Sequence, residues 1–173
     1  MQAEHPGALP STVRRAYSRG MKRAFASGLV FVQILLLIGL LVLPHGTVWP
    51  VNGFVVATAI ALIAVGVALA VQGSTTLGPA MTTSPIPRED APLATNGVYA
   101  VVRNPIYTGL MSGGLGLVLI GSSLMHVVVW LALIGLLAWK TRWEEQMLVQ
   151  EHPAYSDYAA RVGRFLPGVG RIR

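Results

Sequence analysis

The chain has 173 residues, of which 53% are hydrophobic and 12% are charged, whereas soluble domains contain about 25% charged residues. Its 13 Lys and Arg and 7 Asp and Glu are unevenly placed, because residues 24–87 and 104–139 contain none of them. Uncharged apolar runs of this length are typical of membrane-spanning helices. They exclude a soluble enzyme, a disulfide-bonded scaffold and a disordered tail.

A basic segment precedes the first apolar run. Residues 1–23 are interpreted as a mobile leader, and residues 24–43 as the first transmembrane helix. The leader contains Arg14, Arg15, Arg19, Lys22 and Arg23. Basic residues beside a span favour the cytoplasmic side, so the N-terminus is expected there. The run is longer than a signal-peptide core and lacks a small-residue cleavage site, so a retained anchor is expected.

Three further spans follow in chain order. The loop at 44–50 contains two prolines and a glycine, which end the first helix, and residues 51–72 form the second span. Residues 105–120 and about 125–142 are predicted to form a tight hairpin around Gly121-Ser122-Ser123, since short spans are tolerated by local membrane thinning. The fold class is therefore all-α integral membrane, with about four transmembrane helices in a domain over residues 24–173 and both termini in the cytoplasm.

The remaining polar residues concentrate in residues 75–107 and 140–151, which the hairpin returns to one membrane surface. The net charge of +6 is attributed to topology and to attraction by anionic lipid. Nucleic acid is not an expected partner, because the cations flank spans without an aromatic platform. With no cysteine and four scattered histidines, no metal site is expected.

Asn104-Pro105 has two interpretations at the start of the third span. Asn is a good N-cap and Pro is favoured at the first helical position, which predicts helix capping. Alternatively, this helix terminus and Arg103 form a site for a carboxylate or phosphate. Tyr99 and Tyr107 have an ordinary role as interfacial anchors.

Small residues line the third span. Gly109, Gly113 and Gly116 recur at spacings of four and three. This spacing predicts close approach to a neighbouring membrane helix.

Glu144 and Glu145 lie at the cytoplasmic end of the fourth span. One interpretation is a solvated helix end, with Lys140 as an i, i+4 partner of Glu144. The other is an inward carboxylate that binds a sulfonium or ammonium ligand. Beyond them, a short helix is predicted near Pro153, with Asp157 and Arg161 as a pair.

Taken together, four segments resemble the isoprenylcysteine carboxyl methyltransferase family and the related phospholipid N-methyltransferases. That pattern is L-x-T-x-G-x-Y-x-x-x-R-H-P-x-Y-x-G, then a helical hairpin, an E-E pair and Y-x-x-Y-x-x-R-V-x-x-x-x-P. The matching segments here are residues 93–99 (LATNGVY), 103–109 (RNPIYTG), 144–145 (EE), and 155–162 (YSDYAARV) followed by Leu166-Pro167. The resemblance covers roughly residues 75–168.

The resemblance implies an S-adenosylmethionine-dependent integral membrane methyltransferase, with S-adenosylhomocysteine as a product. The implied cofactor contacts are Ala91, Pro92, Leu93, Ala94, Tyr99, Asn104, Pro105, Ile106, Tyr107 and Glu144, with Ser84 as a weaker candidate. The expected catalytic residues are Arg103, Asn104 and Tyr107, and the expected substrate residues are Lys140, Arg142 and Glu145. Asn104 stands where the family most often has histidine, so chemistry that needs an imidazole there is not expected.

The expected acceptor is a lipophilic molecule that enters between spans. A carboxylate is already ionised and needs no general base, which favours O-methylation. A phospholipid amine must lose a proton and is the alternative. A non-catalytic four-helix membrane protein is a second alternative. An ion-coupled exporter is disfavoured, because it would need a charge within a span and the uncharged runs at 24–87 and 104–139 offer none. Oligomeric state is not predicted.

Overall fold

The computed structural model describes the backbone of residues 11–78 and 93–172, and the side chains of residues 24–78 and 93–172. The elements are α1 (Ser11–Val42), α2 (Gly53–Leu77), the 3-10 helix η2 (Gly97–Ala100), α3 (Pro105–Gly121), α4 (Leu124–Glu151) and α5 (Tyr155–Arg161). The part of the chain that the structure describes is helical, and its only strand-like pairing is one isolated bridge between Val102 and Gly163. The predicted all-α class is confirmed.

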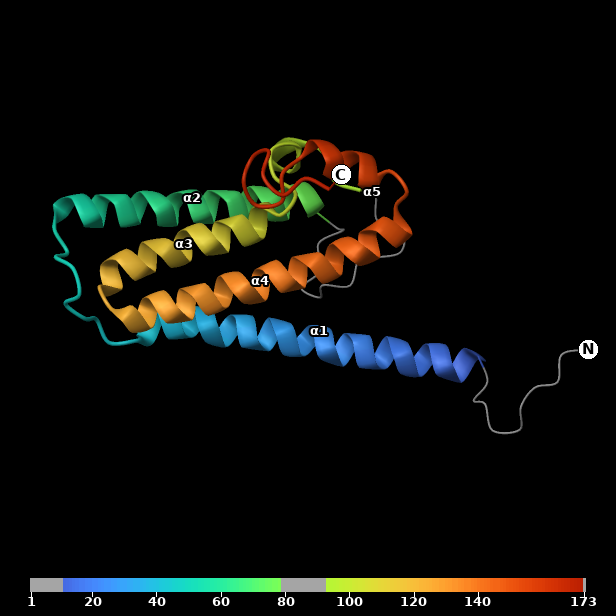
Figure 1. Cartoon of the computed structure of the whole chain (residues 1–173), viewed down its shortest axis with the longest axis horizontal. Coiled ribbons are helices and arrows are strands. Elements are labelled where there is room, and N and C mark those ends of the chain that lie inside the picture. The colour runs from blue at the N-terminus through green and yellow to red at the C-terminus, as the bar shows by residue number, and fades with distance from the viewer. Residues whose placement is uncertain (1–10, 79–92, 173) are drawn as a thin grey trace, which may run out of the picture.

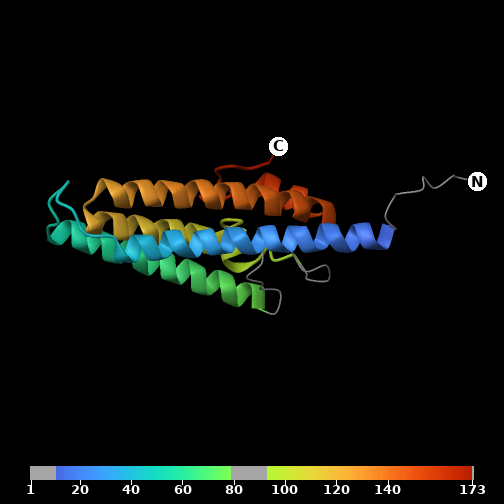
Figure 2. The same ribbon diagram turned by 90° about the horizontal axis from the view of Figure 1, so that it is seen from below.

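The four long helices lie side by side in the order α2, α3, α4, α1 (Figure 1). Figure 2 shows the same bundle turned by 90°, with the helices running along one general direction. The most extensive contact joins α2 to α3, and α1 packs against α4 and, to a smaller extent, α3. A core of Leu40, Val118, Leu133 and Leu137 joins α1, α3 and α4.

Three helical segments are long and apolar enough to span a membrane, namely Ala24–Val42, Gly53–Leu77 and Leu124–Glu151. The apolar helix α3 has 17 residues and measures roughly 25 Å, slightly less than a hydrocarbon core of about 30 Å. Many large apolar side chains point outward, including Phe31, Leu41, Phe54 and Leu124, each more than 60% exposed. Such exposure suits contact with lipid, so the chain is a membrane protein.

Three helices extend well beyond the predicted spans. α2 ends at Leu77 instead of at residue 72. α1 begins at Ser11, so residues 11–23 continue the first helix backward instead of forming a separate leader. α4 extends to Glu151, because no helix breaker interrupts the sequence before Pro153. Glu144 and Glu145 therefore lie within α4, about two turns before its end.

The uncharged loop at 44–50 docks on the turn between α3 and α4. Gly46 N donates to Gly121 O at 2.8 Å, and Val48 N donates to Ser122 O at 3.0 Å. The Ser122 hydroxyl donates to Trp49 O at 2.6 Å. Ser122 ends α3 with φ of 43° and Ser123 caps α4, so the predicted hairpin is confirmed. The turn thus supplies hydrogen-bond partners for backbone groups of this uncharged loop.

Glycines bring α2 and α3 into backbone contact, as the spacing on α3 predicted. A Cβ added to Gly109 would lie 2.4 Å from Gly66 O, and one added to Gly116 would lie 2.7 Å from Ala59 O. The third predicted position differs. The backbone of Gly113 faces Gly66, but a Cβ on Gly113 itself would meet nothing within 4 Å.

This difference provides a matched pair of substitutions on one helix. Gly109→Ala is expected to destabilise the protein by about 1–3 kcal/mol, because backbone atoms must move to admit the methyl group. Gly113→Ala should leave stability unchanged or raise it slightly, since alanine favours helix over glycine. Thermal unfolding in detergent measures both variants. Equal melting temperatures would contradict the close packing of α2 on α3.

The C-terminal segment folds over the start of α3. Tyr155, Tyr158 and Ala159 form a second core cluster. The predicted ion pair between Asp157 and Arg161 is wrong, because Arg161 Nε donates to the backbone oxygen of Asp157 at 3.2 Å instead.

Candidate active site

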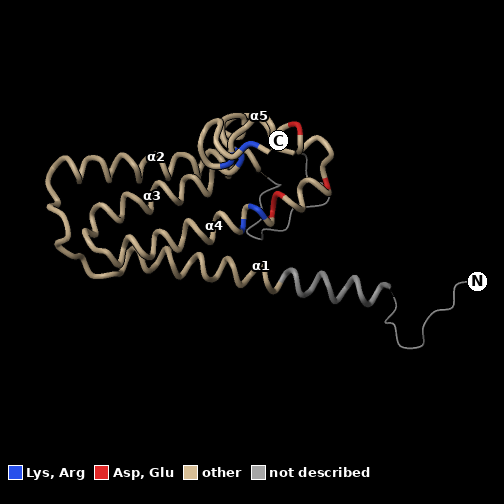
Figure 3. The backbone as a smooth tube through the Cα atoms, viewed as in Figure 1, with Lys and Arg blue, Asp and Glu red and all other residues tan. Residues whose placement is uncertain are grey.

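The charged residues whose side chains the structure describes lie toward one end of the bundle (Figure 3). We call this region the charged end. It comprises the last turns of α2, η2, the start of α3, α4 from Lys140 onward, α5 and the C-terminal segment. Sequence reasoning predicted that the two polar segments return to one surface, and the helical hairpin brings their described parts together there.

A tyrosine on α3 faces a glutamate on α4. The Tyr107 hydroxyl donates to Glu144 Oε1 at 2.7 Å. The Lys140 ammonium, one turn earlier on α4, lies 4.8 Å from the centre of the Tyr107 ring, within the range of a cation–π interaction. A cation, a phenol and a carboxylate therefore share one half-buried site between two helices.

Lys140 is linked to a third helix. It is 3% exposed, and its Nζ donates to Gln33 Oε1 on α1 at 3.0 Å. A buried ammonium needs hydrogen-bond acceptors to offset lost hydration. Gln33 was not among the residues predicted for the site. Its signal in the sequence is weak, a single amide within an apolar, uncharged run.

Tyr99 joins η2 to α2. Its hydroxyl lies 3.4 Å from Gly73 O, to which it donates, and its backbone oxygen accepts a 2.6 Å hydrogen bond from the Tyr158 hydroxyl. Burial raises the pKa of Tyr99 to about 12, and the charge of Glu144 adds to this shift. Tyr99 is therefore a neutral phenol at physiological pH, close enough to Glu144 to sense its charge.

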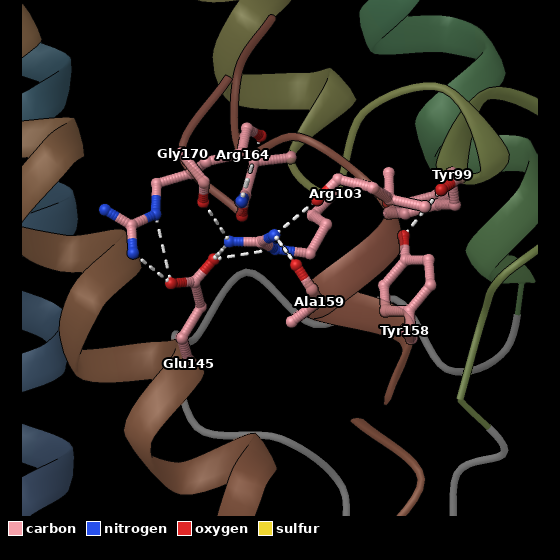
Figure 4. Close-up of polar contacts among 9 residues, drawn as sticks. Tyr99, Arg103, Glu145, Tyr158, Ala159, Arg164 and Gly170 are labelled. Atoms are coloured by element: carbon pink, nitrogen blue, oxygen red, sulfur yellow. Dashed lines mark hydrogen bonds and ion pairs between the residues drawn. The ribbon is translucent and has the colours of Figure 1, made fainter. Parts of the chain in front are cut away.

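Arg103 binds the C-terminal part of the chain (Figure 4). Its Nε and Nη2 both donate to Glu145 Oε1, at 3.0 and 2.8 Å. Nη1 donates to the backbone oxygens of Ala159 and Val162, and Nη2 also donates to Gly170 O at 3.0 Å. These contacts use all five N–H groups of the guanidinium. Arg103 therefore joins α3, α4, α5 and the C-terminal segment.

Glu145 is shared by two arginines. Its Oε2 accepts from Arg164 Nη2 at 2.6 Å, while Oε1 accepts from Arg103. Next to this pair, Arg103 N donates to Gly163 O at 2.8 Å and Asn104 N donates to Arg164 O at 3.1 Å. We call Arg103, Glu145 and Arg164 the C-terminal clamp.

Asn104 occupies the N-cap position of α3, directly before Pro105. The predicted side-chain cap is wrong, because the Asn104 side chain makes no capping hydrogen bond. Its Nδ2 instead donates to Arg164 O at 3.3 Å. The nearby C-terminal segment offers this carbonyl as a partner that local sequence does not reveal.

The other predicted site residues are distributed around this end. Pro105 and Ile106 pack against Gly73 of α2, and Leu93 packs against the cluster of Tyr155, Tyr158 and Ala159. Ala94 is half-buried, and Arg142 is exposed on α4. The remaining predicted positions, Ser84, Ala91 and Pro92, lie outside the described residues.

The Glu144 carboxylate has room to bind a charged organic ligand. Within residues 24–78 and 93–172, no group of three metal-ligating side chains occurs. Glu144 accepts one hydrogen bond among the described residues and retains acceptor capacity for a ligand cation. The Glu144 carboxylate can therefore accept a hydrogen bond from the ammonium group of a ligand. The fold and site together define a helical membrane protein with a cluster of polar and charged side chains at one end of the bundle.

A family comparison identifies the class. Residues 54–154 match the model of the phospholipid methyltransferase family, and the chain belongs to that family. No curated protein matches the chain. Membership supports a membrane methyltransferase and implies S-adenosylmethionine as the methyl donor.

Proposed function

We propose that the protein transfers a methyl group from S-adenosylmethionine to a lipophilic, anionic acceptor at the charged end, which faces the cytoplasm. The observation that carries this proposal is the cluster of Tyr107, Lys140 and Glu144 between α3 and α4. It places opposite charges beside a phenol within helices that contact lipid.

In this proposal, Glu144 holds the cofactor's amino group by a charge-assisted hydrogen bond. Tyr107 orients the Glu144 carboxylate through the 2.7 Å hydrogen bond. The uncharged ring of Tyr99 lines the same site. The predicted backbone contacts at residues 91–94 and 104–106 would complete the pocket. When bound, S-adenosylmethionine supplies an already activated methyl group, so alignment of the acceptor provides much of the acceleration.

Lys140 supplies the positive charge for the acceptor. A carboxylate acceptor is ionised before it binds, so O-methylation requires no general base. The Asn104 side chain is bonded to Arg164 O and cannot accept a proton in any case. These features favour a lipophilic carboxylate, and exposed Arg142 lies where it would attract such an anion.

Arg103 and Glu145 have a different role in this proposal from the catalytic and substrate roles that the sequence suggested. Their charged groups are paired with each other and 5% exposed or less. We infer that they position Tyr107 and Glu144, because each is close in sequence to one of these residues.

A phospholipid amine is the second candidate acceptor. The family match to phospholipid methyltransferases favours it. The amine must lose a proton before or during methyl transfer, and in our proposal the Glu144 carboxylate is already engaged by the cofactor. Lys140 would then bind the phosphodiester of the same headgroup.

Thermal unfolding in detergent tests cofactor use. S-adenosylhomocysteine at about 100 times its Kd should stabilise the protein by about 2.7 kcal/mol. ATP and NADPH, which also carry adenosine, should produce no shift. No shift with S-adenosylhomocysteine would favour a non-catalytic membrane protein.

A further inference from the structure

The helix α1 lies outside residues 54–154 that match the family, yet it reaches the candidate site. Leu36, Leu37 and Leu40 face the core shared with α4. Gln33 precedes them by three, four and seven residues and therefore lies on the same helix face. Its partner Lys140 follows the core residue Leu137 on α4. The Gln33–Lys140 contact is thus the next layer beyond the core, toward the charged end.

The chemistry of this contact preserves a positive charge. Gln33 Oε1 accepts one N–H of the Lys140 ammonium, and the Tyr107 ring lies beneath the same group. A glutamate at position 33 would neutralise the ammonium, whereas an amide satisfies one donor and adds no charge. Among the described residues, the ammonium has no other hydrogen-bond acceptor, so two of its three donors remain for a ligand.

We propose that Gln33 is a specificity-determining positioning residue, which holds the Lys140 ammonium for the negatively charged oxygen group of a lipid acceptor. The ligand chemistry is a carboxylate or a phosphodiester attached to a hydrocarbon chain. This inference rests on the proposed function, since it assigns the acceptor side of the same site. It makes α1 part of the site that selects the acceptor.

A purely structural role for Gln33 gives a different expectation. If Gln33 only ties α1 to α4, then Gln33→Glu should preserve or strengthen the tie, because a carboxylate also accepts from Lys140. If Gln33 preserves a charged anion site, the same substitution should abolish it. The glutamate variant therefore separates the two roles without removing the helix contact.

The test compares binding of three lipids to the full-length protein by native mass spectrometry. The probes are oleate, dioleoyl phosphatidylglycerol and dioleoylglycerol, which supply a carboxylate, a phosphodiester and no anion. Gln146→Glu is the matched control, because Gln146 is exposed on α4 and receives the same change. Lys140→Gln is a second variant, which removes the charge and retains an amide contact to Gln33.

We expect Gln33→Glu and Lys140→Gln to weaken retention of at least one anionic lipid about tenfold or more. Gln146→Glu and dioleoylglycerol binding should be unchanged, and the preferred anion identifies the ligand source. S-adenosylhomocysteine binding to Gln33→Glu should match the wild type in calorimetry. Equal lipid retention by all variants would overturn the inference, as would loss of S-adenosylhomocysteine binding, which would assign Lys140 to the cofactor. If the wild type bound no S-adenosylhomocysteine, the proposed function would fail while the anion site was still measured.

Discussion

Replacing Glu144 by alanine is expected to weaken S-adenosylhomocysteine binding by about 10- to 100-fold, as measured by calorimetry in detergent. The reason is the loss of a charge-assisted hydrogen bond, which contributes about 1.5–3 kcal/mol. Glu144 is half-buried in α4, and its described partner is the Tyr107 hydroxyl. In the proposed function, removal of the carboxylate leaves the cofactor's amino group without its counter-charge.

Two variants control this experiment. Glu151→Ala removes an exposed carboxylate from the end of the same helix and should bind S-adenosylhomocysteine like the wild type. Tyr107→Phe should give a smaller loss than Glu144→Ala, because the carboxylate remains but loses its orienting donor. Wild-type affinity in Glu144→Ala would show that Glu144 does not hold the cofactor.

Replacing Arg103 by methionine is expected to destabilise the fold by about 3 kcal/mol, since it removes one of the two arginines that pair with the buried Glu145 carboxylate. For a protein of this size, that corresponds to a melting temperature lower by about 10 °C. The C-terminal segment should also become more sensitive to protease, because Arg103 binds the backbone at Ala159, Val162 and Gly170. Thermal unfolding and limited proteolysis measure these two effects.

Arg161→Met is the matched control for Arg103→Met. Arg161 is exposed on α5 and its side chain donates to the backbone of its own helix, so its replacement should change stability little. If Arg103→Met melted like the wild type but lost methyl transfer, a catalytic role for Arg103 would replace the positioning role. The positioning role in the C-terminal clamp predicts instead that Arg103→Met lowers the melting temperature.

The spans and the hairpin were predictable because the signal is local. Charge-free runs, the prolines at positions 44 and 50 and the serines after Gly121 each act on nearby backbone. The α2–α3 contact was partly predictable for the same reason, since small residues recur on one face of α3. Helix ends were less accurate, because α1 and α4 continue into polar sequence that contains good helix formers.

Side-chain partners were not predictable in the same way. Asn104 bonds to Arg164 and Arg103 bonds to Glu145, across separations that only the folded chain defines. From local sequence, the Asn104 side chain was predicted to cap α3 and Arg103 to bind an anion. In the structure both side chains bond to distant parts of the same chain. Gln33 was not predicted because a single amide in an apolar span matches no motif. Its role depends on the contact with Lys140, which comes from a helix distant in the sequence.

Methyl transfer by the purified protein in lipid nanodiscs tests the central claim most directly. The protein is incubated with methyl-labelled S-adenosylmethionine and a lipid extract, and the products are identified by mass spectrometry. The account predicts label in a base-labile methyl ester of a lipophilic carboxylate, at a level that Glu144→Ala strongly reduces. Label in a phospholipid amine would establish the second candidate acceptor. No label in any lipid, from protein that retains its fold, would contradict the account.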